Sequence, residues 1–276
     1  MHMLAANGAN IPAIGLGTWT LKDRQCADIV SAAIAAGYRH IDTAAMYDNE
    51  AAVGEGIRAG GVARDELFVT TKVWPSDLAS GRLQQSVETS LERLGLDHVD
   101  LALVHWPSRT VPLAETIAAL NDVAARGMAR HIGVSNFTTG LLEEACALSS
   151  RPLACNQVEY HPHLDQTKVH AACLKHGMAM IAYCPLGRDG TVFEEPAVRS
   201  AAEAHERSPS QVVLRWHVQQ EGVGAIPRTT RTNRLAQNLA VFDFELSREE
   251  MAAIGALGRA NRRICDFEFS PEWDAA

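Results

Sequence analysis

The sequence alternates eight times between a short apolar segment and a segment of helical spacing, and this regularity constrains the fold most. The apolar segments are residues 13–18, 38–42, 67–73, 99–105, 131–135, 155–159, 178–183 and 223–227. Nearly continuous apolar character is typical of parallel strands that are buried on both faces. Eight such units predict an α/β protein with a closed (β/α)8 TIM barrel. A doubly wound sheet is the weaker alternative, because the chain has no G-x-G-x-x-G segment.

The two ends of the chain fall outside this repeat. The Asn-Gly pair at positions 7 and 8 predicts a tight turn, so residues 3–12 are expected to form a small two-stranded lid ahead of the barrel. The last residues are irregular and aromatic, with Phe267, Phe269 and Trp273. Two alternatives stay open for them: a tail over the barrel mouth, or a terminus that is disordered or merely packed. No linker divides the chain, so residues 1–276 are predicted to form one domain.

Charge and cysteine content narrow the cellular setting and the partners. The 25 basic and 33 acidic residues give a net charge of −8, which disfavours nucleic acid as a partner. The six cysteines include no C-x-x-C pair and are expected to be buried thiols in a reducing compartment. The sequence has neither a secretory signal pattern nor an apolar stretch of about 20 residues. We therefore expect a soluble, cytoplasmic monomer without membrane contact.

Ionisable side chains stand where consecutive predicted strands end. Asp42 ends the second strand, Lys72 lies at the end of the third, and His105 ends the fourth. Tyr47 follows Asp42 in the adjoining loop. Because the carboxyl ends of neighbouring parallel strands meet at one mouth of a barrel, these four side chains are predicted to converge there.

The chemistry of this group indicates proton transfer to a substrate oxygen. A tyrosine has a pKa near 10, so Tyr47 needs a cation to become a better acid, and Lys72 is expected to lower its pKa. Asp42 would balance the charge of Lys72, and His105 would donate a hydrogen bond to the substrate. Each residue alone has a structural explanation, such as a helix cap or a solvated rim position. Together they predict an active site.

A metal site is the alternative suggested by YHPHLD at 160–165. His161, His163 and Asp165 would suit an amidohydrolase-like barrel. However, the intervening proline turns the two histidines, and no further His-Asp set follows at later strand ends. We therefore predict no metal. The absence of G-x-S-x-G and of Tyr-x-x-x-Lys disfavours a serine hydrolase and the other main carbonyl reductase fold.

Ordered motifs along essentially the whole chain resemble those of the aldo-keto reductase superfamily. They are GLGTW at 15–19, GYRHIDTA at 37–44, TKVW at 71–74, HWP at 105–107, GVSNF at 133–137, NQVEYHP at 156–162, YCPLG at 183–187 and IPRT at 226–229. The resemblance implies a TIM barrel that binds an extended NADP(H) and reduces aldehydes or ketones to alcohols. It also implies that the catalytic tetrad is Asp42, Tyr47, Lys72 and His105, with Tyr47 as the general acid.

The same resemblance implies a set of cofactor contacts. Ser135, Asn136 and Gln157 match the positions that hold the nicotinamide carboxamide, and Tyr183 matches the aromatic ring on which the nicotinamide stacks. An amide needs paired donors and acceptors, which Asn136 and Gln157 supply. The remaining implied contacts near the barrel mouth are Gly17, Thr18, Trp19, Asp42, Pro185, Leu186, Gly187 and Ile226.

The segment IPRTTRTNRLAQN resembles the family's phosphate-binding segment at the adenosine end. Arg228 and Thr229 replace the usual Lys-Ser pair, and the matching contacts further on are Arg234, Gln237 and Asn238. Since the arginine fork suits a 2′-phosphate, Arg228, Arg231 and Arg234 favour NADPH over NADH. NADH stays a weaker alternative.

A short loop after His105 and a brief tail resemble the smaller bacterial branch that includes diketogluconate reductases. The predicted open mouth is lined by Trp19, Leu21, Tyr47, Trp74, His105 and Trp106. Such a pocket suits small aldehydes, dicarbonyls, keto sugars or aromatic aldehydes. A second hypothesis is a cofactor-sensing regulatory module on the same barrel. The intact tetrad argues against it, because a sensor needs no proton donor.

Overall fold

The computed structural model describes residues 2–275, and its centre is a sheet of eight parallel strands that follow one another in chain order. They are β3 (Leu16–Gly17), β4 (His40–Asp42), β5 (Phe68–Val73), β6 (Val99–Val104), β7 (Ala129–Ser135), β8 (Leu153–Glu159), β9 (Ala179–Tyr183) and β10 (Val223–Ala225). The predicted eight-stranded α/β barrel is confirmed.

The barrel closes where its first and last strands meet. Ile14 forms a parallel bridge with Ala225, and Gly15 N donates to the Ala225 carbonyl oxygen at 2.9 Å. Gly17 N donates to the Pro227 carbonyl oxygen at 3.1 Å. A Cβ on Gly17 would lie 2.7 Å from the Ile226 carbonyl oxygen, so only glycine allows this approach. Gly17 of the GLGTW motif therefore serves the closure of the barrel.

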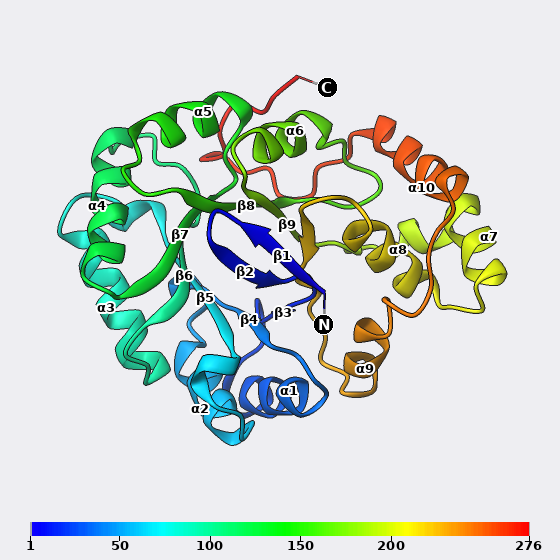
Figure 1. Cartoon of the computed structure of the whole chain (residues 1–276), viewed down its shortest axis with the longest axis horizontal. Helices are drawn as coiled ribbons and strands as arrows, with labels where there is room; N and C mark the ends of the chain where they lie inside the picture. Colours follow the sequence, from blue (N-terminus) through cyan, green and yellow to red (C-terminus); the bar gives the residue numbers. More distant parts are fainter. Residues whose placement is uncertain (1, 276) are drawn as a thin grey trace.

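The helices surround the strands (Figure 1). They are α1 (Asp23–Ala35), α2 (Glu50–Ala59), α3 (Arg82–Leu94), α4 (Leu113–Ala125), α5 (Thr139–Leu148), α6 (Thr167–Lys175), α7 (Pro196–Ala204), α8 (Pro209–Val218), α9 (Asn233–Leu239) and α10 (Arg248–Gly255). Helix α3 illustrates the pattern, because its buried face includes Leu83, Val87, Leu91 and Leu94 at helical spacing. It ends at Gly95, whose φ of 66° is in the left-handed region.

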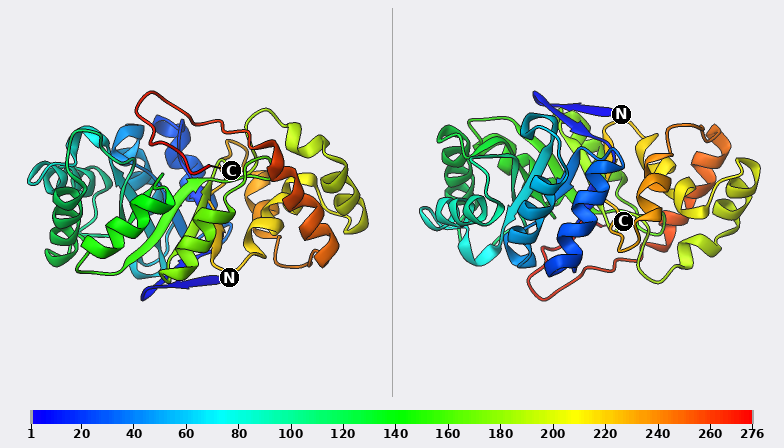
Figure 2. Two further views of the ribbon diagram at one scale, coloured as in Figure 1. Left: turned by 90° about the horizontal axis from the view of Figure 1, so that it is seen from above. Right: turned by 90° about the horizontal axis from the view of Figure 1, so that it is seen from below.

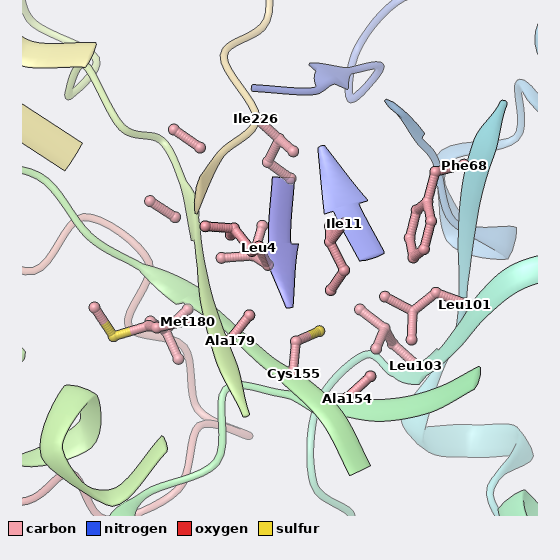
Figure 3. Close-up of a cluster of buried hydrophobic side chains, with 14 of the residues drawn as sticks. Leu4, Ile11, Phe68, Leu101, Leu103, Ala154, Cys155, Ala179, Met180 and Ile226 are labelled. Atoms are coloured by element: carbon pink, nitrogen blue, oxygen red, sulfur yellow. The ribbon is translucent and has the colours of Figure 1, made fainter. Parts of the chain in front are cut away.

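The predicted N-terminal hairpin is present, with β1 (Met3–Ala6) antiparallel to β2 (Ala9–Pro12). Leu4 and Ile11 from this hairpin pack against the inward side chains of the barrel (Figure 3). Asn7 Nδ2 donates to the carbonyl oxygens of Leu153 at 2.7 Å and His176 at 2.9 Å. Since Leu153 begins β8, the hairpin covers the amino ends of the strands, opposite the predicted active site.

The C-terminal tail crosses the other end of the barrel (Figure 2). The ring of Phe269 lies edge-on to Trp106, with centroids 5.4 Å apart, and to Trp74 at 5.5 Å. Arg109 donates to the Ser270 carbonyl oxygen at 2.5 Å. Of the two alternatives for the tail, the structure shows the first, a segment folded over the mouth.

The cysteines are all free thiols: Cys26, Cys155, Cys173 and Cys265 are buried, and Cys146 and Cys184 are half-buried. Within residues 2–275, no helix combines the length and the apolar character needed to cross a membrane.

Candidate active site

A buried ion pair stands at the centre of the predicted site. Lys72 in β5 has no exposed surface, and Asp42 at the end of β4 is 1% exposed. Lys72 Nζ donates to Asp42 Oδ1 at 2.5 Å and to the Thr43 carbonyl oxygen at 2.7 Å. Gln157 Nε2 donates to the other carboxylate oxygen at 2.7 Å. Burial lowers the pKa of Lys72, but Asp42 and Tyr47 raise it by a larger amount. The net pKa is above its usual value of 10.5, so the ammonium group keeps its charge.

Tyr47 lies beside this pair at the end of a short 3-10 helix, Ala45–Tyr47. Its hydroxyl is 3.4 Å from Lys72 Nζ, and the ammonium nitrogen is 4.9 Å from the ring centroid. Burial raises the pKa of Tyr47 above 10.0, and the charge of Lys72 opposes this rise without cancelling it. The expected net lowering of this pKa is therefore wrong for this structure. Loss of hydration outweighs the nearby cation, and Tyr47 is protonated at neutral pH.

His105 completes the predicted tetrad after β6. Its ring lies edge-on to Tyr47, with centroids 5.6 Å apart, and to Trp74 at 5.1 Å. Burial and the charge of Lys72 lower the pKa of His105 well below 6.5, so the ring is neutral. Its Nδ1 is buried and has no hydrogen-bond partner among residues 2–275. The structure thus brings all four residues together, with a neutral imidazole beside a protonated phenol.

The residues predicted to hold the nicotinamide form a connected network at the ends of β7, β8 and β9. Asn136 Nδ2 donates to the His105 carbonyl oxygen at 2.9 Å, and Tyr183 donates to Asn136 Oδ1 at 2.7 Å. Ser135 Oγ donates to the Gln157 carbonyl oxygen at 2.7 Å. Because Gln157 also contacts Asp42, the network is continuous with the ion pair.

The predicted contacts of the first barrel loop lie next to the same site. Thr18 is buried, and its Oγ1 donates to the Asp42 carbonyl oxygen at 2.9 Å. Trp19 is 41% exposed. The Arg188 guanidinium lies over its ring, with Cζ 4.5 Å from the ring centroid. The other predicted positions on neighbouring strand ends are Gly17 and Ile226 at the barrel seam, and Pro185, Leu186 and Gly187 after β9.

The predicted adenosine-end residues follow β10 and extend into α9. Arg228, Arg231 and Arg234 are exposed and make no ion pair with any residue from 2 to 275. Thr229 is 5% exposed, and its Oγ1 accepts a hydrogen bond from Arg231 N at 3.0 Å. Asn238 is buried and Gln237 is exposed on α9. The three cations are therefore free to meet an external anion.

The residues predicted to line the substrate pocket differ in their placement. Trp74 is half-buried beside His105, and Trp106 is 4% exposed because Phe267, Phe269 and Trp273 pack around it. Leu21 does not line the open mouth, contrary to expectation, since it has no exposed surface. Its carbonyl oxygen accepts a hydrogen bond from the buried Asn49 Nδ2 at 3.0 Å, which holds this loop against the one that follows β4.

Several contacts that shape the mouth have no counterpart in the sequence motifs. The Thr43 contact with Lys72 comes from a carbonyl oxygen, which every residue type carries. Glu159 at the end of β8 accepts hydrogen bonds from Ile264 N and Cys265 N, both at 2.6 Å, and so fixes the start of the tail. Such long-range contacts have no local spacing signal.

The metal alternative finds no converging ligands in the structure. His161 is hydrogen-bonded to Glu159 at 3.0 Å and His163 to Glu195 at 2.7 Å. Asp165 Oδ1 accepts hydrogen bonds from Thr167 at the start of α6. Over the described part of the chain, no group of three or more His, Cys, Asp or Glu side chains could hold a metal ion.

Comparison with known proteins agrees with this geometry. Residues 13–259 match the model of the aldo/keto reductase family. The chain is 40% identical to methylglyoxal reductase DkgB of Yersinia pestis, over 96% of this chain and 100% of that protein. The solved structure of a candidate 2,5-diketo-D-gluconic acid reductase B is 47% identical, with a TM-score of 0.97 over 100% of this chain and 98% of that one.

A Bombyx mori aldo-keto reductase solved in complex with NADP is 35% identical, with a TM-score of 0.89 over 96% of this chain and 95% of that one. The matched region contains all the strands of the barrel and the four polar residues at its mouth. The chain therefore belongs to the aldo/keto reductase family and is an oxidoreductase that acts on carbonyl groups.

Proposed function

We propose that this protein reduces aldehydes and ketones to alcohols with NADPH, and that Tyr47 donates the proton. The observation that carries the proposal is the position of Lys72. Its buried ammonium group contacts the Asp42 carboxylate and lies 3.4 Å from the Tyr47 hydroxyl, beside the neutral ring of His105. A structural ion pair alone would need neither a phenol nor an imidazole at this position.

Each residue has a distinct task in the proposed reaction. His105 donates a hydrogen bond to the carbonyl oxygen and so orients the substrate. Tyr47 transfers its proton as negative charge develops on that oxygen, because a phenol is a stronger acid than the alcohol formed. Lys72 stabilises the phenolate left behind, and Asp42 keeps Lys72 charged and in place.

The residues at the mouth fit NADP(H), which when bound supplies the hydride. Asn136 and Gln157 carry amide groups suited to a carboxamide, and Tyr183 offers an aromatic face beside them. Arg228 and Arg234 are exposed and form no ion pair within the described residues 2–275, which leaves them available to a 2′-phosphate. The NADP complex of the Bombyx mori relative supports the same choice. NADH is proposed as the weaker alternative.

We propose small carbonyl compounds as substrates, namely dicarbonyls, keto sugars or aromatic aldehydes. Trp74 lies edge-on to His105, and Phe269 from the tail packs edge-on to Trp74, so aromatic side chains flank His105, as suits a small carbonyl compound. The names of the relatives agree with this class, since one is a methylglyoxal reductase and another a candidate diketogluconic acid reductase.

The proposal is tested by Tyr47→Phe, which removes the hydroxyl and leaves the ring. NADPH oxidation with methylglyoxal is expected to fall by about 10²- to 10⁴-fold. NADPH affinity, measured by fluorescence titration, should change little. Tyr160→Phe is the matched control, because the Tyr160 hydroxyl bonds Gln220 at 2.9 Å outside the site.

Retained turnover in Tyr47→Phe would refute the role of Tyr47. Tight NADPH binding by the unaltered protein, without turnover of glyoxals, keto sugars or aromatic aldehydes, would instead favour a cofactor sensor.

A further inference from the structure

A groove lies between the segment that carries Tyr47 and helix α3. Its volume is about 430 Å³, which is within the range of small-molecule sites. The residues of this groove that the argument uses are Ala45, Met46, Trp74, Gln85, Ser86 and Thr89. The first three follow β4 and β5, and the other three share one face of α3 at helical spacing. No residue of the catalytic tetrad lines the groove, so it is a separate space.

The groove adjoins the proposed active site through two of its lining residues. Trp74 lines the groove, and its ring also lies edge-on to His105 with centroids 5.1 Å apart. Met46 lines the groove, is 44% exposed and directly precedes Tyr47 in the short 3-10 helix. A substrate whose carbonyl group lies at Tyr47 and His105 can therefore extend past Trp74 and Met46 into the groove.

The helical wall of the groove carries hydrogen-bonding groups that the fold does not use. The side chains of Gln85 and Ser86 form no hydrogen bond with any residue from 2 to 275. Thr89 Oγ1 donates to the Gln85 carbonyl oxygen at 2.9 Å, which leaves its lone pairs free to accept. Amide and hydroxyl groups both donate and accept, as the hydroxyl groups of a sugar chain do. The opposite wall, with Trp74 and Met46, offers apolar surface to the C–H groups of such a chain.

The charges in the groove are balanced. Arg82 lines it and pairs with Asp77, with Nη2 and Oδ1 2.6 Å apart. Arg93 lines its far end and pairs with the buried Glu50, with Nη1 and Oε2 3.6 Å apart. Because both arginines already face a carboxylate, an anionic ligand would have to compete with that carboxylate for each of them. The groove therefore suits a neutral chain better than a carboxylate or a phosphate.

We propose that this groove is a subsite for the neutral polyhydroxy chain of a sugar-derived dicarbonyl, whose aldehyde group lies at Tyr47 and His105. The inference rests on the proposed function and narrows its substrate class. Gln85 and Ser86 bind the hydroxyl groups, and Trp74 packs against the carbon chain. A three-carbon dicarbonyl ends before the groove and gains nothing from it. The groove therefore increases the affinity for long neutral substrates and leaves short ones unaffected.

The first experiment compares methylglyoxal with 3-deoxyglucosone, which has the same 2-oxoaldehyde group on a longer polyhydroxy chain. In the double variant Gln85→Leu, Ser86→Ala, the KM for 3-deoxyglucosone should rise about five- to fiftyfold, because two hydrogen-bonding side chains are lost. The KM for methylglyoxal and both kcat values should be unchanged. Glu92→Leu is the control, since Glu92 is exposed on α3 outside the groove. An equal change of KM for the two substrates, or none, would overturn the proposal.

A second pair of substrates tests the charge of the chain. D-glucose and D-glucuronate open to the same aldehyde and differ only at C6, where the second carries a carboxylate. The value of kcat/KM for D-glucose should equal or exceed that for D-glucuronate, since the arginines of the groove are already paired. A preference for D-glucuronate of more than about tenfold, the size of a charged hydrogen bond, would overturn the assignment to neutral chains.

Binding without turnover separates a failure of the groove from a failure of the proposed function. D-sorbitol has a six-carbon polyhydroxy chain and no carbonyl group, so the protein cannot reduce it. Saturation-transfer difference NMR should detect D-sorbitol on the parent chain and on Glu92→Leu, and the signal should be lost in the variant that combines Gln85→Leu with Ser86→Ala. No signal with the parent chain, or an equal signal with the double variant, would refute the subsite even if methylglyoxal is reduced. A protein that binds D-sorbitol in this way but reduces no carbonyl compound would retain the subsite and lose the reductase.

Discussion

The two ends of the same barrel are built on opposite principles. At the amino ends of the strands, the hairpin places Leu4 and Ile11 on an apolar interior that includes Leu101 and Met180 (Figure 3). At the carboxyl ends, Asp42 and Lys72 form a buried ion pair, and the C-terminal tail crosses this end of the barrel (Figure 2). Apolar burial stabilises the amino end of the barrel. The carboxyl end keeps two charges in a site without water, an arrangement that serves catalysis and adds little to stability.

Lys72→Met is expected to have the largest effect, because it should lower both the stability and the turnover of the protein. Asp42 would keep its bond to Gln157 but lose its counter-ion, which costs about 3 to 5 kcal/mol of unfolding free energy. Turnover should fall by more than about a hundredfold. Urea unfolding and NADPH oxidation measure the two effects.

Lys175→Met is its control, since Lys175 pairs with Glu143 on the surface and should cost less than about 1 kcal/mol. Full activity in Lys72→Met would break the distinction between the two ends.

Ile11→Ala tests the apolar end alone. Ile11 is fully buried, so its truncation should cost about 2 to 5 kcal/mol of unfolding free energy. Turnover of the folded protein should be unchanged, because the hairpin is at the end opposite Tyr47. Met3→Ala is the matched control on the same hairpin, since Met3 is 44% exposed and its loss should cost within about 0.5 kcal/mol. A large loss of turnover in folded Ile11→Ala would show that the two ends are coupled.

Replacing Arg228 and Arg234 by glutamine tests whether the carboxyl end of the barrel distinguishes NADPH from NADH. If these side chains bind a 2′-phosphate, NADPH affinity should fall about ten- to a hundredfold while NADH affinity stays nearly constant. Titration with both cofactors measures this difference, and Arg248→Gln provides an exposed control on α10. Equal losses for the two cofactors would exclude a phosphate contact.

The pH profile is expected to give the smallest effect. The pKa of His105 lies well below 6.5, and the pKa values of Tyr47 and Lys72 lie above 10.0 and 10.5. None of these groups changes its charge between about pH 7 and pH 9, so kcat/KM should be flat there. The measurement is best made in Cys184→Ser, which removes a thiol with a pKa of about 7. An inflection that disappears in His105→Gln would show that His105 titrates in this range.

Sequence patterns predicted the strands and the polar residues well because both depend on local chemistry. Strands β5 and β6 are buried along their whole length, and their carboxyl ends place Lys72 and His105 where the sequence pattern predicted them. The pattern could not say which end the hairpin covers, since that depends on the contact of Asn7 with distant carbonyl groups.

Other features depend on competition between physical effects or on distant contacts. The pKa of Tyr47 is set by burial against the charge of Lys72, and a motif does not give the balance. Leu21 was misplaced because its side chain packs into the hydrophobic core, a long-range arrangement that no local spacing predicts.

The seam between Ile14 and Ala225 also has a consequence for biosynthesis. All four polar residues of the mouth are encoded within the first 105 positions, yet the strand that completes the ring begins at Val223. While the ribosome is still elongating the chain, the nascent protein holds these groups without the enclosure that desolvates them. Enzymatic competence therefore has to await the synthesis of β10.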